Sequence, residues 1–188
     1  MGRWEPDARG RLRAAALELF DERGFDGTTV AEIADRAGLT ERTFFRHFAN
    51  KREVLFAGAE ALEGEMVRTI EEAPPSMPAM KAVALGLRAI AEQIPNDREY
   101  VRRRSAIIAA NPELQERERN KLAALADAAA AALRKRGVEK SVAYLASETG
   151  IAVFRAAFPR WLAENDDRTL TGFISQSLEE LRAVTASF

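Results

Sequence analysis

The chain is 188 residues long, with 30% charged residues, 47% hydrophobic residues, a net charge of −1 and a pI of about 6.0. This balance excludes a protein that coats nucleic acid with its whole surface, so any binding to DNA has to be local. The chain contains no cysteine, which excludes a disulfide framework and a thiolate metal site.

The first two predicted helices are short and each carries one apolar stripe. In the first helix, which ends at Gly24, the stripe is Leu12, Ala16, Leu19 and Phe20. In the second helix it is Val30, Ile33, Ala34 and Ala37. Thr29 begins the second helix, and Glu32 completes a capping box in which each side chain binds the other residue's backbone N–H. Gly38 can take the left-handed conformation that ends a helix, so a tight turn is expected there.

A third helix follows this turn directly. Thr40 is its natural N-cap, and Phe44 and Phe48 lie one turn apart and can face the core. The opposite side presents side chains that suit phosphates and bases, namely Arg42, Thr43, Arg46 and His47. Between Arg36 and Arg52 there are five basic residues and one acid, a local charge of 5 − 1 = +4. Together these features predict a helix-turn-helix that binds DNA.

Six further helices are expected in the rest of the chain. The first of them begins at Asn50, which caps it with Glu53 at the third position, and continues to about Ala73. A proline-rich turn ends it, and the other five are expected over 79–93, 97–110, 111–137, 139–164 and 167–183. Pro159 should kink the helix in which it lies. Because no segment shows the alternation of a strand, the expected fold class is all-α.

Five segments in the N-terminal third of the chain occur together: Phe20-Asp-Glu-Arg-Gly-Phe25, Thr28-Thr29, Ile33-Ala-Asp-Arg-Ala-Gly38, Thr43-Phe-Phe-Arg-His-Phe48 and Asn50-Lys51. In this combination residues 11–55 resemble the DNA-binding domain of the TetR family of bacterial transcriptional regulators. The resemblance implies that five residues touch DNA or brace the domain, namely Thr29, Thr40, Phe45, His47 and Lys51. Phe45 stands where a tyrosine hydroxyl usually binds a phosphate. From their outward position, the expected base readers are Arg42, Thr43 and Arg46.

The resemblance also implies the organisation of the whole chain. Residues 1–50 would form the three-helix DNA-binding domain, and 51–188 a six-helix domain that binds a small-molecule effector and dimerises through its last two helices. The segments Arg102-Arg-Arg-Ser and Asn111-Pro-Glu-Leu resemble a branch of the family common in actinobacteria. Candidates for the effector pocket are Met66, Ile90, Arg104, Ile108, Phe154 and Phe158. For Arg104, an ion pair with an interior carboxylate is favoured over an anchor for an anionic ligand.

The expected function is that of a transcriptional repressor that leaves a palindromic operator when its effector binds. The main alternative is a helical ligand-binding or protein-interaction module that no longer reads DNA. An enzyme is the third alternative, but the sequence contains no recognisable catalytic arrangement, and a single histidine, His47, excludes a multi-histidine metal site. We therefore expect no enzymatic activity, no cofactor and no metal.

Neither an apolar signal core nor a run of about eighteen apolar residues is present in the sequence. We therefore expect a cytoplasmic homodimer that does not bind a membrane. Its expected partners are double-stranded operator DNA and a small molecule.

Overall fold

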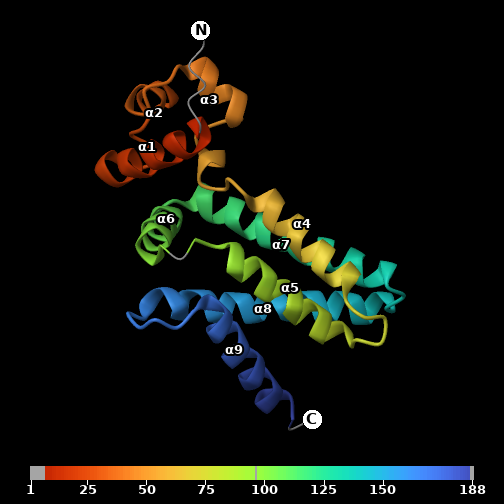
Figure 1. The fold of residues 1–188 in the computed structure, drawn as a ribbon. Coiled ribbons are helices and arrows are strands. Elements are labelled where there is room, and N and C mark those ends of the chain that lie inside the picture. Colours follow the sequence, from red (N-terminus) through yellow and green to blue (C-terminus); the bar gives the residue numbers. More distant parts are fainter. Residues whose placement is uncertain (1–6, 96, 187–188) are drawn as a thin grey trace. The chain divides into compact units, whose positions relative to one another are not determined.

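All regular secondary structure in the computed structural model is helical. The structure describes residues 7–95 and 97–186. Within these ranges it contains nine α-helices, one 3₁₀ turn and no strand, which confirms the all-α class (Figure 1). The bounds are α1 Ala8–Arg23, α2 Val30–Arg36, α3 Glu41–His47, η1 Arg52–Val54, α4 Ala59–Glu72, α5 Ala79–Gln93, α6 Arg98–Ala110, α7 Pro112–Lys135, α8 Lys140–Ala163 and α9 Leu170–Thr185.

The chain forms two compact units, and they are not simply consecutive in sequence. The N-terminal unit consists of the chain up to Ala57 together with Glu99–Arg117, so it includes most of α6 and the first turns of α7. The C-terminal unit consists of Gly58–Arg98 and the chain from Glu118 onward. A division at residue 50 therefore does not follow the packing, because 51–57 and 99–117 share the core of the helix-turn-helix.

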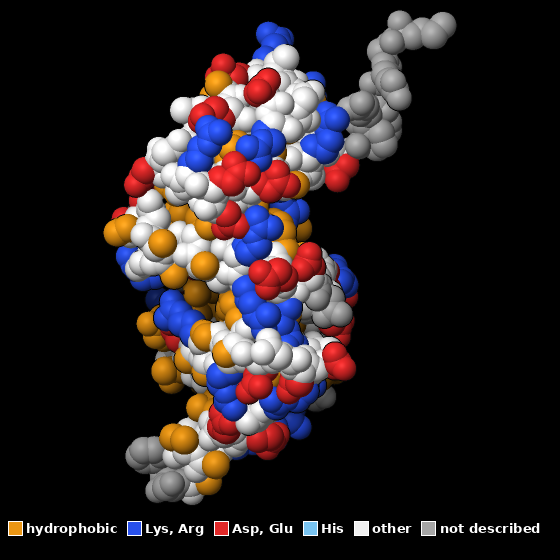
Figure 2. Space-filling view, turned by 90° about the vertical axis from the view of Figure 1, so that its left-hand side faces the viewer, with side chains coloured by type: hydrophobic (Ala, Val, Ile, Leu, Met, Phe, Trp, Pro, Cys, Tyr) orange, Lys and Arg blue, Asp and Glu red, His pale blue; other side chains and the backbone are white. Residues whose placement is uncertain are grey.

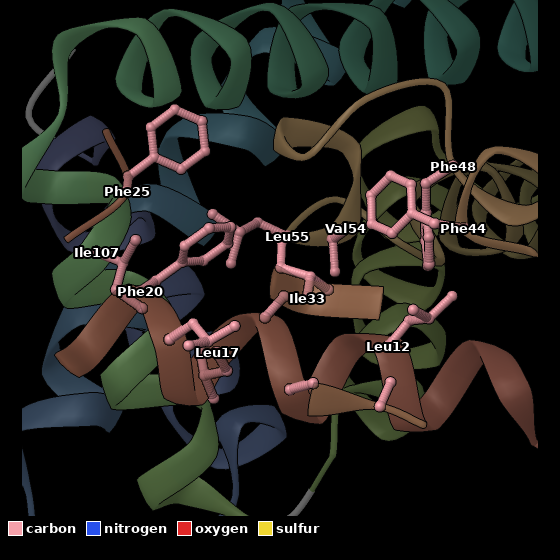
Figure 3. Packing of buried hydrophobic residues seen from close by; sticks show 14 of the residues in the cluster. Leu12, Leu17, Phe20, Phe25, Ile33, Phe44, Phe48, Val54, Leu55 and Ile107 are labelled. Atoms are coloured by element: carbon pink, nitrogen blue, oxygen red, sulfur yellow. The ribbon is translucent and has the colours of Figure 1, made fainter. Parts of the chain in front are cut away.

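The core of the N-terminal unit is built on the stripes expected from the sequence. Leu12, Ile33 and Phe44 are completely buried and come from three different helices (Figure 3). The same cluster takes in Val54 and Leu55, which follow α3, and residues of α6 and α7, namely Ile107, Ile108 and Leu114. Burial of each large apolar side chain stabilises the fold by about 1.5–3 kcal/mol, so this core holds the short helices α2 and α3 in place.

The segment after α3 differs from the expected continuous helix. Asn50 does act as a cap, since its Oδ1 accepts a hydrogen bond from the Glu53 N–H at 3.2 Å, but only the 3₁₀ turn η1 follows. Gly58 then has a φ of 93°, a left-handed conformation that an α-helix cannot contain. Helix α4 therefore begins at Ala59, nine residues after the expected start. The same rule ends α7, where Gly137 has a φ of 84° as its position predicted.

The C-terminal unit is a bundle in which α4 packs on α5, and α5 and α9 pack on α8. Met66 of α4 is completely buried there. A Cβ atom added to Gly150 of α8 would lie 2.4 Å from Cγ1 of Val83 in α5, so glycine is what allows these two helices to approach so closely. Helix α8 continues through Pro159 to Ala163. None of the helices in the described ranges combines the length and the apolar content that a membrane crossing needs.

Candidate nucleic-acid interface

The start of α2 has the predicted cap. The Thr29 Oγ1 accepts a hydrogen bond from the Glu32 N–H at 3.2 Å, and Oε2 of Glu32 accepts one from the Thr29 N–H at 2.8 Å. These hydrogen bonds, led by the one from the Thr29 backbone, lower the pKa of Glu32. The Thr29 hydroxyl also donates to Oε2 of Glu32 at 2.8 Å, so in this structure it braces the helix start.

Helix α3 presents one apolar face and one polar face. Thr40 is its N-cap, with Oγ1 accepting from the Thr43 N–H at 3.2 Å. Phe44 and Phe48 are buried, as predicted, whereas Phe45 is 55% exposed. The exposed ring of Phe45 is available for apolar contact with a sugar or a thymine methyl, but it has no hydroxyl to bind a phosphate.

Arg42 and Arg46 project from the polar face of α3 and are exposed. Neither makes an ion pair or a hydrogen bond with any other residue in the described ranges. A guanidinium can donate two parallel hydrogen bonds to guanine O6 and N7 or to a phosphate. The two side chains therefore offer free donors on the outer side of a rigidly held helix.

The two other arginines of this segment, Arg36 and Arg52, are paired with carboxylates. Arg36 of α2 donates to Glu22 at 2.9 and 3.0 Å and to Glu18 at 3.3 Å, and its hydrogen bond lowers the pKa of Glu22. Arg52 donates to Glu113 at 2.9 Å. The local charge of +4 counted along the sequence thus overstates the free positive charge on this unit. Figure 2 likewise shows positive and negative side chains interspersed on the face that it displays.

Lys51 is a brace for the loop between α1 and α2. Its Nζ donates to the carbonyl oxygens of Phe25 at 2.7 Å and Thr28 at 2.9 Å, and lies 3.4 Å from that of Asp26. It also lies 4.4 Å from the centroid of the Phe25 ring. An ammonium has three donors, so these contacts occupy it without DNA. Of the two roles that the resemblance allowed, DNA contact or bracing, the geometry favours bracing.

His47 is half-buried at the end of α3. Its Nε2 is buried and has no hydrogen-bond partner among the described residues. Contact with a phosphate would therefore have to be made through Nδ1. The neighbouring ring is that of Phe48, with the two centroids 6.5 Å apart.

One basic residue near this interface was not identified from the sequence. The Arg9 guanidinium of α1 lies 5.5 Å from the centroid of the Phe48 ring, which places this exposed cation beside the C-terminal end of α3. It makes no ion pair with another described residue. No local pattern indicates this position, because the two residues are far apart in the sequence and meet only in the folded unit.

Ionic contacts join α6 and α7 to the other helices of the N-terminal unit. Arg103 donates to the Asp21 carboxylate of α1. Arg117 donates two hydrogen bonds of 3.0 Å to the Glu53 carboxylate, which lower the pKa of Glu53. Arg104, a candidate for the effector pocket, donates from Nε to the Leu55 carbonyl at 2.6 Å. This hydrogen bond ties α6 to the segment that follows α3.

The six pocket candidates do not share one unit. Arg104 and Ile108 belong to the N-terminal unit, and Ile108 is part of its core. The other four belong to the C-terminal unit, in α4, α5 and α8, namely Met66, Ile90, Phe154 and Phe158. The rings of Phe154 and Phe158 are stacked, with centroids 5.3 Å apart. Within the described residues there is no group of three His, Cys, Asp or Glu side chains arranged to hold a metal ion.

Family models match both parts of the chain. The model described as bacterial regulatory proteins of the tetR family matches residues 12–57. The model described as the MftR C-terminal domain matches residues 77–186, more than half of the chain.

Among curated proteins, the chain is similar to the HTH-type transcriptional regulator TcmR of Streptomyces glaucescens, with 37% identity over 82 residues. It is also similar to the class A tetracycline repressor protein from transposon 1721 of Escherichia coli, with 45% identity over 51 residues. These matches cover 44% and 27% of this chain, and 36% and 24% of the two relatives. The chain thus spans about a third or less of the length of these relatives.

Solved structures extend the similarity over nearly the whole chain. Thermus thermophilus FadR, a transcriptional repressor in complex with lauroyl-CoA, is 26% identical with a TM-score of 0.53, and 92% of each chain is covered. SmeT, the repressor of the Stenotrophomonas maltophilia multidrug efflux pump SmeDEF, is 22% identical with a TM-score of 0.60. That match covers 94% of this chain and 89% of SmeT, and it shows a shared fold.

Proposed function

Because this chain belongs to the TetR family of bacterial regulatory proteins, we propose that it is a transcriptional repressor that binds a palindromic DNA operator and is released by a small-molecule effector. The observation that carries the DNA-binding part is the pair of exposed, unpaired guanidinium groups of Arg42 and Arg46 on a helix with a buried opposite face. In a dimer, two such helices would enter successive major grooves about 34–36 Å apart.

The roles within the interface follow from the contacts of each side chain. Arg42 and Arg46, with Thr43 between them on the same helix, are the base readers, and Phe45 supplies apolar contact. Arg9 adds a backbone contact at the end of α3. Thr29 and Thr40 position the N-termini of α2 and α3, whose free backbone N–H groups favour a phosphate. The protein acts in the cytoplasm, where the bacterial chromosome is accessible.

The effector binds in the C-terminal unit, at the apolar residues Met66, Ile90, Phe154 and Phe158. An amphipathic ligand is supported by FadR of Thermus thermophilus, which was solved with lauroyl-CoA. Ligand binding would favour an arrangement of α4 in which the two recognition helices fit the operator poorly. Release then requires only that the effector bind this arrangement more tightly than the DNA-binding one.

The function is tested by binding of the purified protein to duplex DNA from its own upstream region. A scrambled duplex of equal length is the control, and both are measured at two salt concentrations. We expect a strong preference for the upstream duplex that weakens as salt rises, because phosphate contacts release counterions. Equal weak binding to both duplexes leads to selection from a random library, and no binding in that selection would favour the non-DNA module.

A homodimer is supported by one exposed face of α8. Exposed apolar side chains recur on this face three, four or seven residues apart. This spacing places them in one stripe along the helix, as in the contact seam between two paired helices. The residues of this α8 seam are Val142, Leu145, Ala152, Ala156 and Pro159. Leu145 is 62% exposed, and on α9 Val184 is 68% exposed. Figure 2 shows apolar side chains along this exposed C-terminal end of α9.

Replacing Leu145 by glutamate is expected to dissociate the dimer, because each copy would place an unpaired charge in an apolar interface. Tyr144→Glu is the matched control, since Tyr144 is 57% exposed but lies about 100° away around the helix. Sedimentation velocity should show a monomer for Leu145→Glu and a dimer for Tyr144→Glu. Equal behaviour of the two variants would exclude the α8 seam as the interface.

A further inference from the structure

Two opposite charges border the α8 seam on one side. Glu148 and Arg155 are exposed and lie seven residues apart, about two helical turns, so both project from the same edge of the helix. Neither side chain makes an ion pair or a hydrogen bond with another residue in the described ranges. The apolar stripe is therefore flanked by a carboxylate and a guanidinium that have no partner within the described chain.

The other edge of the seam is occupied by contacts within the C-terminal unit. Ala146 and Val153, which border the stripe on that side, are buried. Arg160, two turns beyond Ala146 and Val153 in the same row, is paired with Glu180 of α9 at 2.7 Å. The charges that remain available to a second copy along the middle of the seam are thus on one edge only.

The direction in which two α8 helices pair decides whether these charges attract or repel each other. In a parallel pair of identical helices, Glu148 lies level with Glu148 of the partner, and Arg155 with the partner's Arg155. In an antiparallel pair, a two-fold axis perpendicular to the helices brings Glu148 to the partner's Arg155, and does so twice. Because like charges side by side oppose association, the charges favour the antiparallel pair.

The sizes of the seam residues favour the same direction. A parallel pair would set Leu145 on Leu145 and Ala156 on Ala156, which crowds one end and leaves a gap at the other. An antiparallel pair sets a large residue against a small one. The facing pairs, with the second residue on the partner, are Val142 with Pro159, Leu145 with Ala156, and Thr149 with Ala152.

One register satisfies the apolar contacts and the charges together. The apolar pairs share a midpoint between Gly150 and Ile151, and the midpoint between Glu148 and Arg155 lies within one residue of it. At this centre Thr149 faces Ala152, and two such small side chains allow the helices to approach closely. No shift along the helix is needed to bring the opposite charges level.

We propose that two copies of the chain pair through antiparallel α8 helices in this register, with Glu148 of each copy forming an ion pair with Arg155 of the partner. This inference rests on the homodimer of the proposed function and specifies its geometry. Charges that border an apolar seam select the partner and its orientation. By symmetry the ion pair occurs twice, so each substitution acts twice.

Charge reversal tests the two ion pairs. Glu148→Arg brings arginines together and Arg155→Glu brings glutamates together, so each should raise the dimer dissociation constant about tenfold to a hundredfold at low salt. The double variant Glu148→Arg/Arg155→Glu restores opposite charges and should return the constant to within about threefold of the parent value. Sedimentation equilibrium measures all three. Lys140→Glu is the control, because Lys140 is exposed on the opposite side of α8 and its reversal should have little effect.

Disulfide trapping tests the direction, in a chain that has no cysteine of its own. The double variant Leu145→Cys/Ala156→Cys should form a covalent dimer under mild oxidation, seen on a non-reducing gel. Within one chain these positions are about 16 Å apart along the helix, too far for an intramolecular disulfide. Leu145→Cys alone should not cross-link, because its two copies lie on opposite sides of the two-fold axis, again about 16 Å apart.

The proposal is overturned if the double charge variant dimerises no better than the single variants. Cross-linking of Leu145→Cys alone would also overturn it, since that is the signature of a parallel pair, and so would a double-cysteine dimer that does not cross-link. If Leu145→Glu dissociates the dimer while charge reversal does not, the seam stands and this register is wrong. A monomeric parent protein would instead refute the homodimer of the proposed function, and operator binding is measured separately from both.

Discussion

Replacing both Arg42 and Arg46 by alanine is expected to weaken operator binding by a factor of about 30 to 10⁴. Each bidentate arginine contact to a base contributes about 1–3 kcal/mol of discrimination, and 1.4 kcal/mol corresponds to a factor of ten. Both side chains are exposed and unpaired within the described chain, so their removal leaves no buried group without a partner. Fluorescence anisotropy with a labelled operator measures the loss, and circular dichroism checks that helicity is retained.

Arg36→Ala is the matched control for this double variant. Arg36 is also a basic residue of the helix-turn-helix, but its guanidinium is held by Glu18 and Glu22. Its removal should change operator affinity by less than about threefold, since exposed ion pairs contribute little and no base contact is lost. Equal operator affinity in the parent protein and in the Arg42/Arg46 double variant would refute the assignment of α3 as the recognition helix.

Replacing Lys51 by methionine is expected to destabilise the N-terminal unit by about 3 kcal/mol. Methionine preserves much of the aliphatic stem but leaves the carbonyls of Phe25 and Thr28 without their charged donor. Hydrogen bonds to a charged group contribute about 1.5–3 kcal/mol each, and an unpaired buried carbonyl adds a cost. Thermal unfolding followed by circular dichroism should show a Tm lower by about 6–12 °C.

Lys81→Met controls for the loss of a lysine charge, because Lys81 is exposed on α5 and makes no hydrogen bond with a described residue. Its Tm should stay within about 1 °C of the parent value. The opposite pattern for Lys51→Met, a normal Tm with weakened operator binding, would show that Lys51 contacts DNA instead of bracing the loop.

Much of the interface could be predicted because it depends on residues close together in the sequence. The capping box of Thr29 and Glu32 spans one helical turn, and so does the inward-facing pair Phe44 and Phe48. Local backbone geometry decides such features, and the structure reproduces them. The bounds of α5 agree with the prediction for the same reason, since Pro78 precedes it and the apolar period of 3.6 runs along it without interruption.

The break before α4 could not be read from the same local signals. Asn50 and Glu53 are a typical helix start, and the apolar spacing continues past Gly58. A glycine inside a helical pattern is compatible with either continuation or a turn. Packing of Val54, Leu55 and Phe56 into the core of the N-terminal unit selects the turn, since a continuous helix could not direct three consecutive side chains to one side.

By itself, the sequence determined the all-α class, the helix-turn-helix and the outward position of Arg42 and Arg46, because helix periodicity and caps act within a few residues. Tertiary structure decided which charges are free, since Glu22 and Glu113 meet Arg36 and Arg52 only after folding. It also decided that the Lys51 ammonium meets the carbonyls of Phe25 and Thr28, and that most of α6 packs with the N-terminal helices. Long-range contacts set these features, and a sequence pattern carries no information on which distant side chains will meet.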